Sequence, residues 1–463
     1  MAGNTRDLTE GAPWKAVMIV SAPMTLGIFA VLSVGIADSY FLGLVGQTEL
    51  AAVGYIYPVT TAITSLSIGL SAGANATLSQ AIGSGESDEA VRRKALQAVG
   101  LGSLAALILA AVVWAFADPL FHLIGASDDV LREIRAYMLW WAPSYPFLVA
   151  MMIANAAFRA HGDGLTSALI MLGSAALNIA LNPVFIFGLW VWPEMGTGGA
   201  GLSTFVARAA AAAAALWWAW QKGMIGYCGS PTEDVRSSVR QITRVGAPAA
   251  FSNAINPAGL AAVTAAVATI GDAAVAGFGA ATRVQSIATV ALFALSAGIG
   301  PVVGQNWGAD KQDRARSAVR ATFLMCIVYG IVVGAVLFFL ADPISLLIAS
   351  DEESASYTAT YLRVVGWTLG GYGILVTANA AMNARDRALF SMSLSIARIF
   401  ALYLPLAWLG VWLMGYAGVA AAAALANIVI IWGAVIATRA TGLLKIDFGP
   451  VKAPAERLER IAS

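Results

Sequence analysis

The sequence is poor in charge. Its 463 residues include only 27 Lys and Arg and 26 Asp and Glu, or 11% of the chain, whereas soluble proteins carry about 25%. A water-soluble fold of this length could not cover its surface with so few charges. The net charge of +1 favours neither a nucleic-acid partner nor an acidic one. With 59% hydrophobic residues, the sequence predicts a membrane protein that does not bind nucleic acid.

Cysteine and histidine are also scarce. Cys228 stands in a short polar stretch and Cys326 in an apolar run, and these are the only two cysteines. They exclude a disulfide framework and disfavour a structural zinc site. His122 and His161 are the only histidines, and neither clustered acids nor a nucleophile motif is present. We therefore expect no metal, no cofactor and no enzymatic activity.

Long apolar runs are abundant. A membrane-spanning helix needs about 20 mainly apolar residues, and the chain offers about twelve such runs. They lie at 14–43, 51–81, 94–117, 134–159, 164–190, 198–221, 240–269, 273–306, 317–341, 356–384, 387–413 and 417–439. The first run starts too late, and is followed by too many others, for a cleaved signal peptide. The expected fold is an all-α polytopic membrane protein.

The runs divide the chain into two groups of six. We expect an N-lobe at 1–222, a cytoplasmic linker at 223–240, a C-lobe at 241–440 and a cytoplasmic tail at 441–463. Lys and Arg gather in alternate connections, as at 92–94, whereas the connections 44–50 and 414–416 contain none. Because short cytoplasmic loops are enriched in these residues, the pattern predicts an inner-membrane protein with both termini in the cytoplasm.

The two lobes repeat one sequence pattern. Six pairs share an offset of 225: Pro23 and Pro248, Gly54 and Gly279, Gly73 and Gly298, Gln80 and Gln305, Gly83 and Gly308, and Asp88 and Asp313. The tetrapeptide 154–157 recurs at 378–381, and Pro183 recurs as Pro405. Parallel repeats with a path between the lobes are typical of transporters. A purely structural duplication is the alternative.

Several segments resemble the multidrug and toxic compound extrusion (MATE) family. They are Pro23, 38–43, 51–54 and 69–83 in the first two spans, and 177–188 and 198–204 in the fifth and sixth. The likeness extends over about 14–440. It implies twelve helices in two lobes arranged as a V, and cation-coupled export of drug-like compounds. The span near 245–270 has Asn253 and Asn256 but no acid, so the chain resembles the DinF-like branch more closely than the NorM-like branch.

Asp38 is the lone carboxylate in the first span. Ionisable residues within membrane spans are costly and mark functional sites, and burial favours the neutral form of a carboxyl group. Asp38 could therefore exchange a proton. Alternatively, it could be hydrated at the outer interface or cap a frayed helix end. The family resemblance implies that it is the coupling acid, whose protonation competes with substrate.

Pro23 lies fifteen residues before Asp38. Proline removes one helical hydrogen bond and can hinge a helix. The resemblance implies that the first helix bends near Pro23 when the acid is protonated. A static kink is the alternative, since Pro248 holds the equivalent place in the other lobe.

Asn178 and Asn182 are four residues apart and share one helix face. We expect them to hydrogen-bond to Asp38, although they could instead simply join helices. In the DinF-like branch an acid usually stands at the place of Asn182, so this amide favours proton over sodium coupling. Tyr137, Asn155 and Thr204 resemble other polar members of the cluster. Asp38, Asn155 and Asn178 are also expected to contact substrate.

Together these features predict a monomeric proton-coupled antiporter that exports amphipathic, cationic compounds across the bilayer. Sodium coupling is the alternative for the ion. A lipid-linked precursor flippase of the same superfamily is the alternative for the cargo, because Arg208, Arg283 and Arg398 could serve an anionic substrate. A receptor or scaffold fits the composition but leaves the repeat and Asp38 unexplained.

Overall fold

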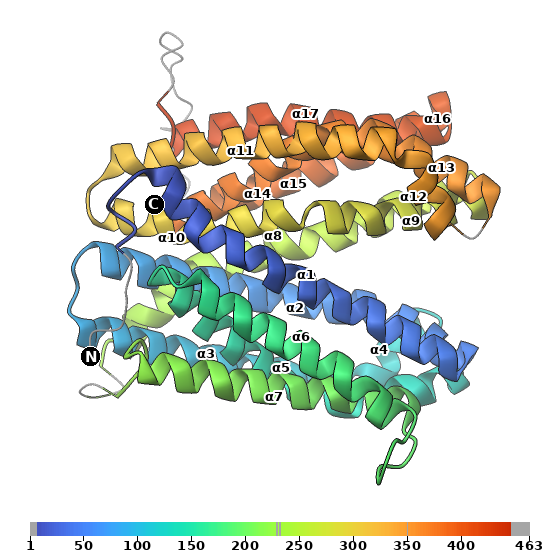
Figure 1. Ribbon diagram of the computed structural model, residues 1–463, viewed down its shortest axis with the longest axis horizontal. Helices are drawn as coiled ribbons and strands as arrows, with labels where there is room; N and C mark the ends of the chain where they lie inside the picture. Colours follow the sequence, from blue (N-terminus) through green and yellow to red (C-terminus); the bar gives the residue numbers. More distant parts are fainter. Residues whose placement is uncertain (1–6, 228–229, 231–232, 350, 446–463) are drawn as a thin grey trace.

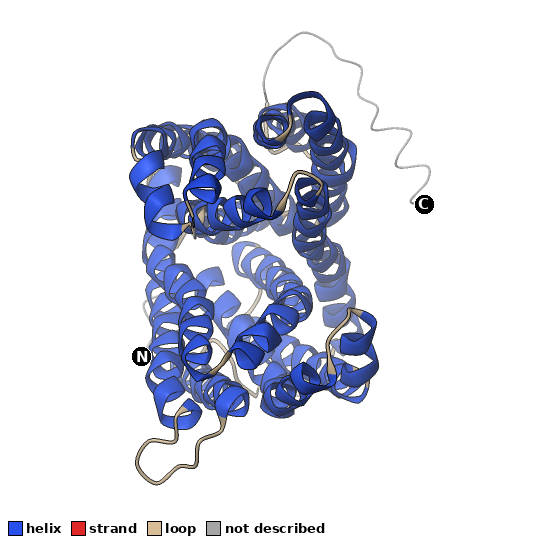
Figure 2. Ribbon diagram, turned by 90° about the vertical axis from the view of Figure 1, so that its right-hand side faces the viewer, coloured by secondary structure: helices blue, strands red, loops and turns tan. Residues whose placement is uncertain are grey.

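The computed structural model describes residues 7–227, 230, 233–349 and 351–445, and every regular element within them is a helix (Figures 1 and 2). This confirms the all-α polytopic fold. The first half holds α1 (Pro13–Val45), α2 (Gln47–Gly83), α3 (Asp88–Ala115), α4 (Ala117–Leu123), α5 (Asp128–Ala160), α6 (Gly164–Ile186) and α7 (Gly196–Gln221). Cys228 and the part of the expected tail beyond Lys445 lie outside the described residues.

The second half begins with α8 (Val235–Ala268), within the stretch expected to be a linker. It continues with α9 (Asp272–Ala288), α10 (Val290–Gly308), α11 (Gln312–Phe339), α12 (Ala341–Ile348), α13 (Glu352–Val365), α14 (Leu369–Ala384), α15 (Ala388–Ile396), α16 (Leu404–Met414) and α17 (Tyr416–Ala440). A 3₁₀ turn, Gly366–Thr368, separates α13 from α14, and a π-helix, Ala397–Tyr403, joins α15 to α16.

Ten helices of the described chain are long and apolar enough to cross a membrane, and the bent pair α9 and α10 adds an eleventh candidate. The pair turns by 42° where it breaks, so the expected run 273–306 is not one straight helix. The expected run 356–384 is also interrupted, by the 3₁₀ turn. The short helices α4 and α12 occupy stretches that hydropathy indicated only as connections.

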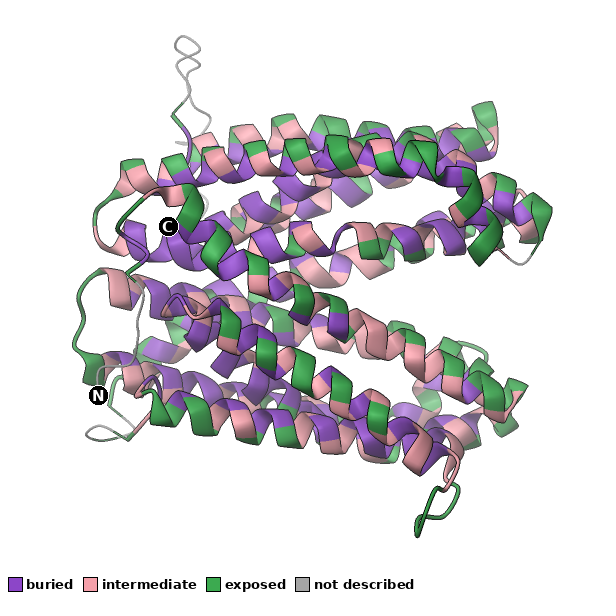
Figure 3. Cartoon of the chain, in the orientation of Figure 1, coloured by how far each residue is buried: buried purple, intermediate pink, exposed green. Residues whose placement is uncertain are grey.

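The two halves lie side by side, with α1 to α7 in blue to green and α8 to α17 in yellow to red (Figure 1). Each half has its own hydrophobic core. Large apolar side chains also point outward, and Leu107, Ile108 and Val332 are each more than half exposed. Exposed positions recur along the outer helices (Figure 3), and the many large apolar residues among them fit a surface solvated by lipid.

Helix α1 is shared between the two halves. Ala16, Val17 and Val20 belong to the core of the second half, whereas the later part of α1 packs along α6 of the first half. Pro23 lies within the continuous helix, next to Met24, which packs against Ala168 of α6 and Ala294 of α10. The proline therefore stands where α1 passes from one half to the other.

Candidate functional site

Asp38 lies between α1 and α6. Its Oδ1 accepts a hydrogen bond of 2.6 Å from Nδ2 of Asn182, and Asn182 is fully buried. The carboxylate is therefore bound to a side chain inside the N-lobe. This is the contact that the sequence predicted for Asn182.

The two amides of α6 face two hydroxyls of α7. Ser203 donates a hydrogen bond to Oδ1 of Asn182, and Nδ2 of Asn178 donates to Thr204 at 3.2 Å. Oδ1 of Asn178 is buried without a partner among the described residues. The four-residue spacing thus does place both amides on one face, but only Asn182 bonds directly to Asp38.

Helix α5 contributes Tyr137 to the same cluster. Tyr137 is buried and lies against Thr204, within electrostatic range of Asp38 and Arg208. The structure therefore brings together five of the predicted residues: Asp38, Tyr137, Asn178, Asn182 and Thr204.

Arg208 is a member of the cluster that the sequence did not assign. Its Nη1 donates to Oγ of Ser144 at 2.8 Å, and its guanidinium lies 5.4 Å from the centre of the Trp141 ring. It also acts electrostatically on Asp38. The rule that singled out Asp38, an ionisable residue inside an apolar span, also marks Arg208, which the sequence offered only as a contact for an anionic substrate.

The remaining two predicted residues lie elsewhere. Asn155 is on α5, eighteen residues after Tyr137, which corresponds to about 27 Å along a helix. It therefore does not belong to this cluster. Pro23 is fifteen residues before Asp38, or about 22 Å along α1, so any effect of the hinge on the acid must travel through the helix.

Hydrogen bonds join the two lobes on one side of the molecule. We call this side the terminal face; it carries Asp7, the turns 84–87 and 309–311, and Lys445. Nε2 of Gln80 donates across the lobes to the Ala384 carbonyl at 2.5 Å. Its repeat partner Gln305 donates to the Ala160 carbonyl at 2.6 Å. The two glutamines therefore make equivalent bonds in opposite directions.

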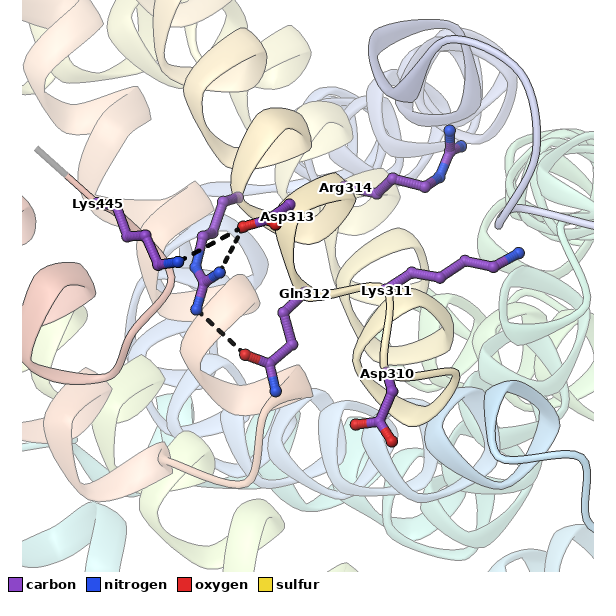
Figure 4. Close-up of a pocket in the computed structure, with 7 residues that line it drawn as sticks. Asp310, Lys311, Gln312, Asp313, Arg314 and Lys445 are labelled. Carbon is purple, nitrogen blue, oxygen red and sulfur yellow. Dashed lines mark hydrogen bonds and ion pairs between the residues drawn. The ribbon is translucent and has the colours of Figure 1, made fainter.

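Two cavities open on the terminal face. In the smaller, of about 510 Å³, Asp313 accepts from Arg316 at 2.6 Å and lies 3.8 Å from Lys445 (Figure 4). The larger, of about 780 Å³, is lined by Glu86, Arg92, Lys222 and other polar residues. Both are strongly charged and lie away from Asp38, so neither provides the apolar lining of a drug-like cargo site.

Among the described residues, no three His, Cys, Asp or Glu side chains gather closely enough to hold a metal ion. The cluster around Asp38 contains one acid, one arginine, amides and hydroxyls. Such groups can bind and release a proton and can orient a polar ligand.

A two-lobed helical bundle with a partly buried carboxylate between its spans is an arrangement typical of secondary transporters. The sequence pattern of the MatE family matches residues 23–184 and, a second time, 248–409. The chain therefore belongs to the MATE family of transporters, as the resemblance implied.

Relatives support this assignment. The chain is 31% identical over 417 residues to a FAD transporter of Shewanella oneidensis, covering 90% of this chain and 92% of the relative. It is 25% identical over 378 residues to a probable multidrug resistance protein, NorM, of Thermotoga maritima, covering 81% and 80%. The solved bent form of the Vibrio cholerae MATE transporter VcmN is similar, with 27% identity, a TM-score of 0.87, and coverage of 93% and 98%.

Proposed function

We propose that the protein is a proton-coupled antiporter that exports small amphipathic compounds, with Asp38 as the group that carries the proton. The observation behind this proposal is the Asp38–Asn182 hydrogen bond inside the N-lobe. Proton and substrate would compete at this site, and linkage requires each to lower the affinity of the other.

The hydrogen-bond directions favour proton over sodium. Sodium prefers several hard oxygen ligands, but Asn182 presents its N–H to Asp38, while its oxygen accepts from Ser203. The guanidinium of Arg208 acts on the same carboxylate and would repel a metal cation. Transfer of a proton needs neither a ligand cage nor removal of the arginine.

Two classes of cargo are compatible with the proposal. A cationic amphiphile would pair with ionised Asp38, as expected from the sequence. An aromatic anion is the second candidate, favoured by the similarity to a FAD transporter. A groove-shaped lipid site is less well supported, because Arg283 is exposed on α9 whereas Arg398 is buried in the C-lobe.

Transport in inverted vesicles tests the coupling. A vesicle interior acidified by a proton gradient should lose protons when ethidium is added, and Asp38→Asn should abolish this release. Asp118→Asn is the matched control, because Asp118 is an aspartate of the short helix α4. Undiminished release by Asp38→Asn, or transport that requires sodium at fixed pH, would contradict proton coupling through Asp38.

A further inference from the structure

The C-lobe repeats the positions of three polar residues of the N-lobe site, Tyr137, Ser144 and Arg208, which we call the polar frame. At an offset of 224, Tyr137 corresponds to Tyr361 and Ser144 to Thr368. In the last helix of each lobe the buried positions match at an offset of 219, as Ala207 and Ala211 of α7 match Ala426 and Ile430 of α17. This offset pairs Arg208 with Asn427. The hydrogen bond from Arg208 to Ser144 also has a counterpart, because Nδ2 of Asn427 donates to Oγ1 of Thr368 at 3.1 Å. The two lobes thus build equivalent sites from the repeat.

The charge of the second site is reversed. The repeat partner of Asp38 is Val263, which is buried. The ionisable residue of the C-lobe site is instead Arg398, which is only 7% exposed. Nη2 of Arg398 donates to Oδ1 of Asn427 at 3.0 Å. Its guanidinium lies 4.8 Å from the ring centre of Tyr372 and 6.0 Å from that of Tyr403.

Arg398 has unused hydrogen-bonding capacity. Among the described residues no carboxylate pairs with it, and its Nε is buried without a partner. Leaving such groups unpaired is costly. A guanidinium has N–H donors and no acceptor, so the group that would satisfy it is an acceptor.

The local backbone is unusual as well. Arg398 lies in the π-helix Ala397–Tyr403, and π-helical turns occur frequently at functional sites. Tyr372 is half-buried beside Arg398 and makes an edge-to-face contact with Phe293 of α10 at 6.0 Å. Because α10 packs on α1 and α2 of the N-lobe, Tyr372 stands on the side of Arg398 that faces the other lobe.

We propose that Arg398, Asn427 and Tyr372 form an anion subsite that binds a phosphate or carboxylate group of the transported molecule, with Tyr372 stacking on its flat ring. A planar guanidinium fork suits both acceptors. This inference rests on the proposed export function and assigns the cargo to aromatic organic anions. It places the anion in the C-lobe, apart from the proton at Asp38.

Binding to the purified full-length protein tests this subsite without any gradient. FAD is the probe, followed by its own fluorescence, and ethidium is the cationic comparison. Arg398→Gln should raise the Kd for FAD at least tenfold and leave that for ethidium within twofold. Arg398→Lys should recover only part of the affinity, because a lysine lacks the fork. Arg283→Gln, on the exposed face of α9, is the matched control.

A second arm tests the recognised group. Inorganic pyrophosphate should displace FAD from the unchanged protein, and added benzoate shows whether a carboxylate is accepted as well. Tyr372→Leu provides an independent variant if Arg398→Gln fails to fold, as judged by thermal unfolding, and should also weaken FAD binding at least threefold.

The inference is overturned if the unchanged protein does not bind FAD, or if folded Arg398→Gln and Tyr372→Leu bind it normally. The export proposal is tested separately by the behaviour of Asp38→Asn in vesicles. FAD could bind at Arg398 without proton-coupled transport, and ethidium could be exported without an anion subsite, so the two failures are distinguishable.

Discussion

Replacing Gln80 and Gln305 with methionine should loosen the terminal face. Methionine keeps the approximate length of the side chain but removes the amide. Gln80 would lose one interlobe bond. Gln305 would also lose one, because its other bond, from the Leu8 amide, stays within the core of the second half.

The magnitude follows from the number of bonds. A buried hydrogen bond contributes a net of about 1 kcal/mol, and 1.4 kcal/mol corresponds to a factor of ten. Each single variant should therefore raise the ratio of open to closed terminal face about 5-fold, and the double variant about 25-fold. If the two sites act independently, their free-energy changes should add to within about 0.5 kcal/mol.

Spin labels can measure this ratio. Glu86→Cys and Asp310→Cys, introduced into a chain without its two native cysteines, place labels on exposed turns of opposite lobes. Double electron–electron resonance should show a longer-distance population that is similar in the two single variants and larger in the double variant. Gln241→Met, an exposed position on α8, should change nothing. An unchanged distance distribution in the double variant would refute the reasoning and leave helix packing alone to hold the face closed.

Three further predictions concern single residues. A methyl group at Gly83 would collide with the Gln305 carbonyl, so Gly83→Ala should favour the longer distance between the spin labels. Gly100 has no neighbour within 4 Å, so Gly100→Ala, the control, should not change that distance. The Asp163 carboxylate accepts hydrogen bonds from the Thr166 amide at 2.9 Å and from Lys222. Burial raises the pKa of Asp163, but these hydrogen bonds lower it by more, so the net pKa is lowered. Asn and Asp cap helices about equally well, so Asp163→Asn should keep the cap but lose the ion pair with Lys222. At neutral pH this should cost about 0.5–1 kcal/mol in thermal unfolding. The deficit should shrink as pH falls below about 4, because the contribution of a depressed acid is lost on protonation. Pro23→Ala should slow ethidium export several-fold in the vesicle assay, and Pro248→Ala much less. Unchanged export by Pro23→Ala would mean that Pro23 is only a static kink.

Hydropathy predicted the spans, and spacing placed Asn178 and Asn182 on one helix face, because both depend on local periodicity. The contact between Asp38 and Asn182 was expected for another reason, since amides buried among apolar spans need a polar partner. They could not predict the break between α9 and α10. No proline or glycine lies between 280 and 297, so nothing in the local sequence marks the turn at Thr289. The short helices α4 and α12 were missed because stretches of 7 and 8 residues carry too little periodic signal.

Part of the C-lobe site could have been predicted from the sequence. The offset of 224 that relates 154–157 to 378–381 also pairs Tyr137 with Tyr361, which marks a second polar frame. What the sequence could not give is the approach of Arg398 to that frame, because the π-helix changes which residues of this span face inward. Asn155 shows the opposite problem: the resemblance assigned it to the Asp38 cluster, although the helical rise along α5 separates them.

The packing of α1 decides which part of it can respond to a proton. Seven of its eight buried residues precede Val31, and only Leu42 follows. The first part is further held by a close approach of Gly298 to Ser21, and the Leu8–Gln305 bond fixes the segment before it. Beyond Val31 the helix is held in the N-lobe chiefly by Leu42 and by the Asp38–Asn182 bond. Neutralising Asp38 weakens that charge-assisted bond, so under the proposed coupling it is the Asp38 end of α1 that swings, about Pro23, while the end shared with the C-lobe stays in place.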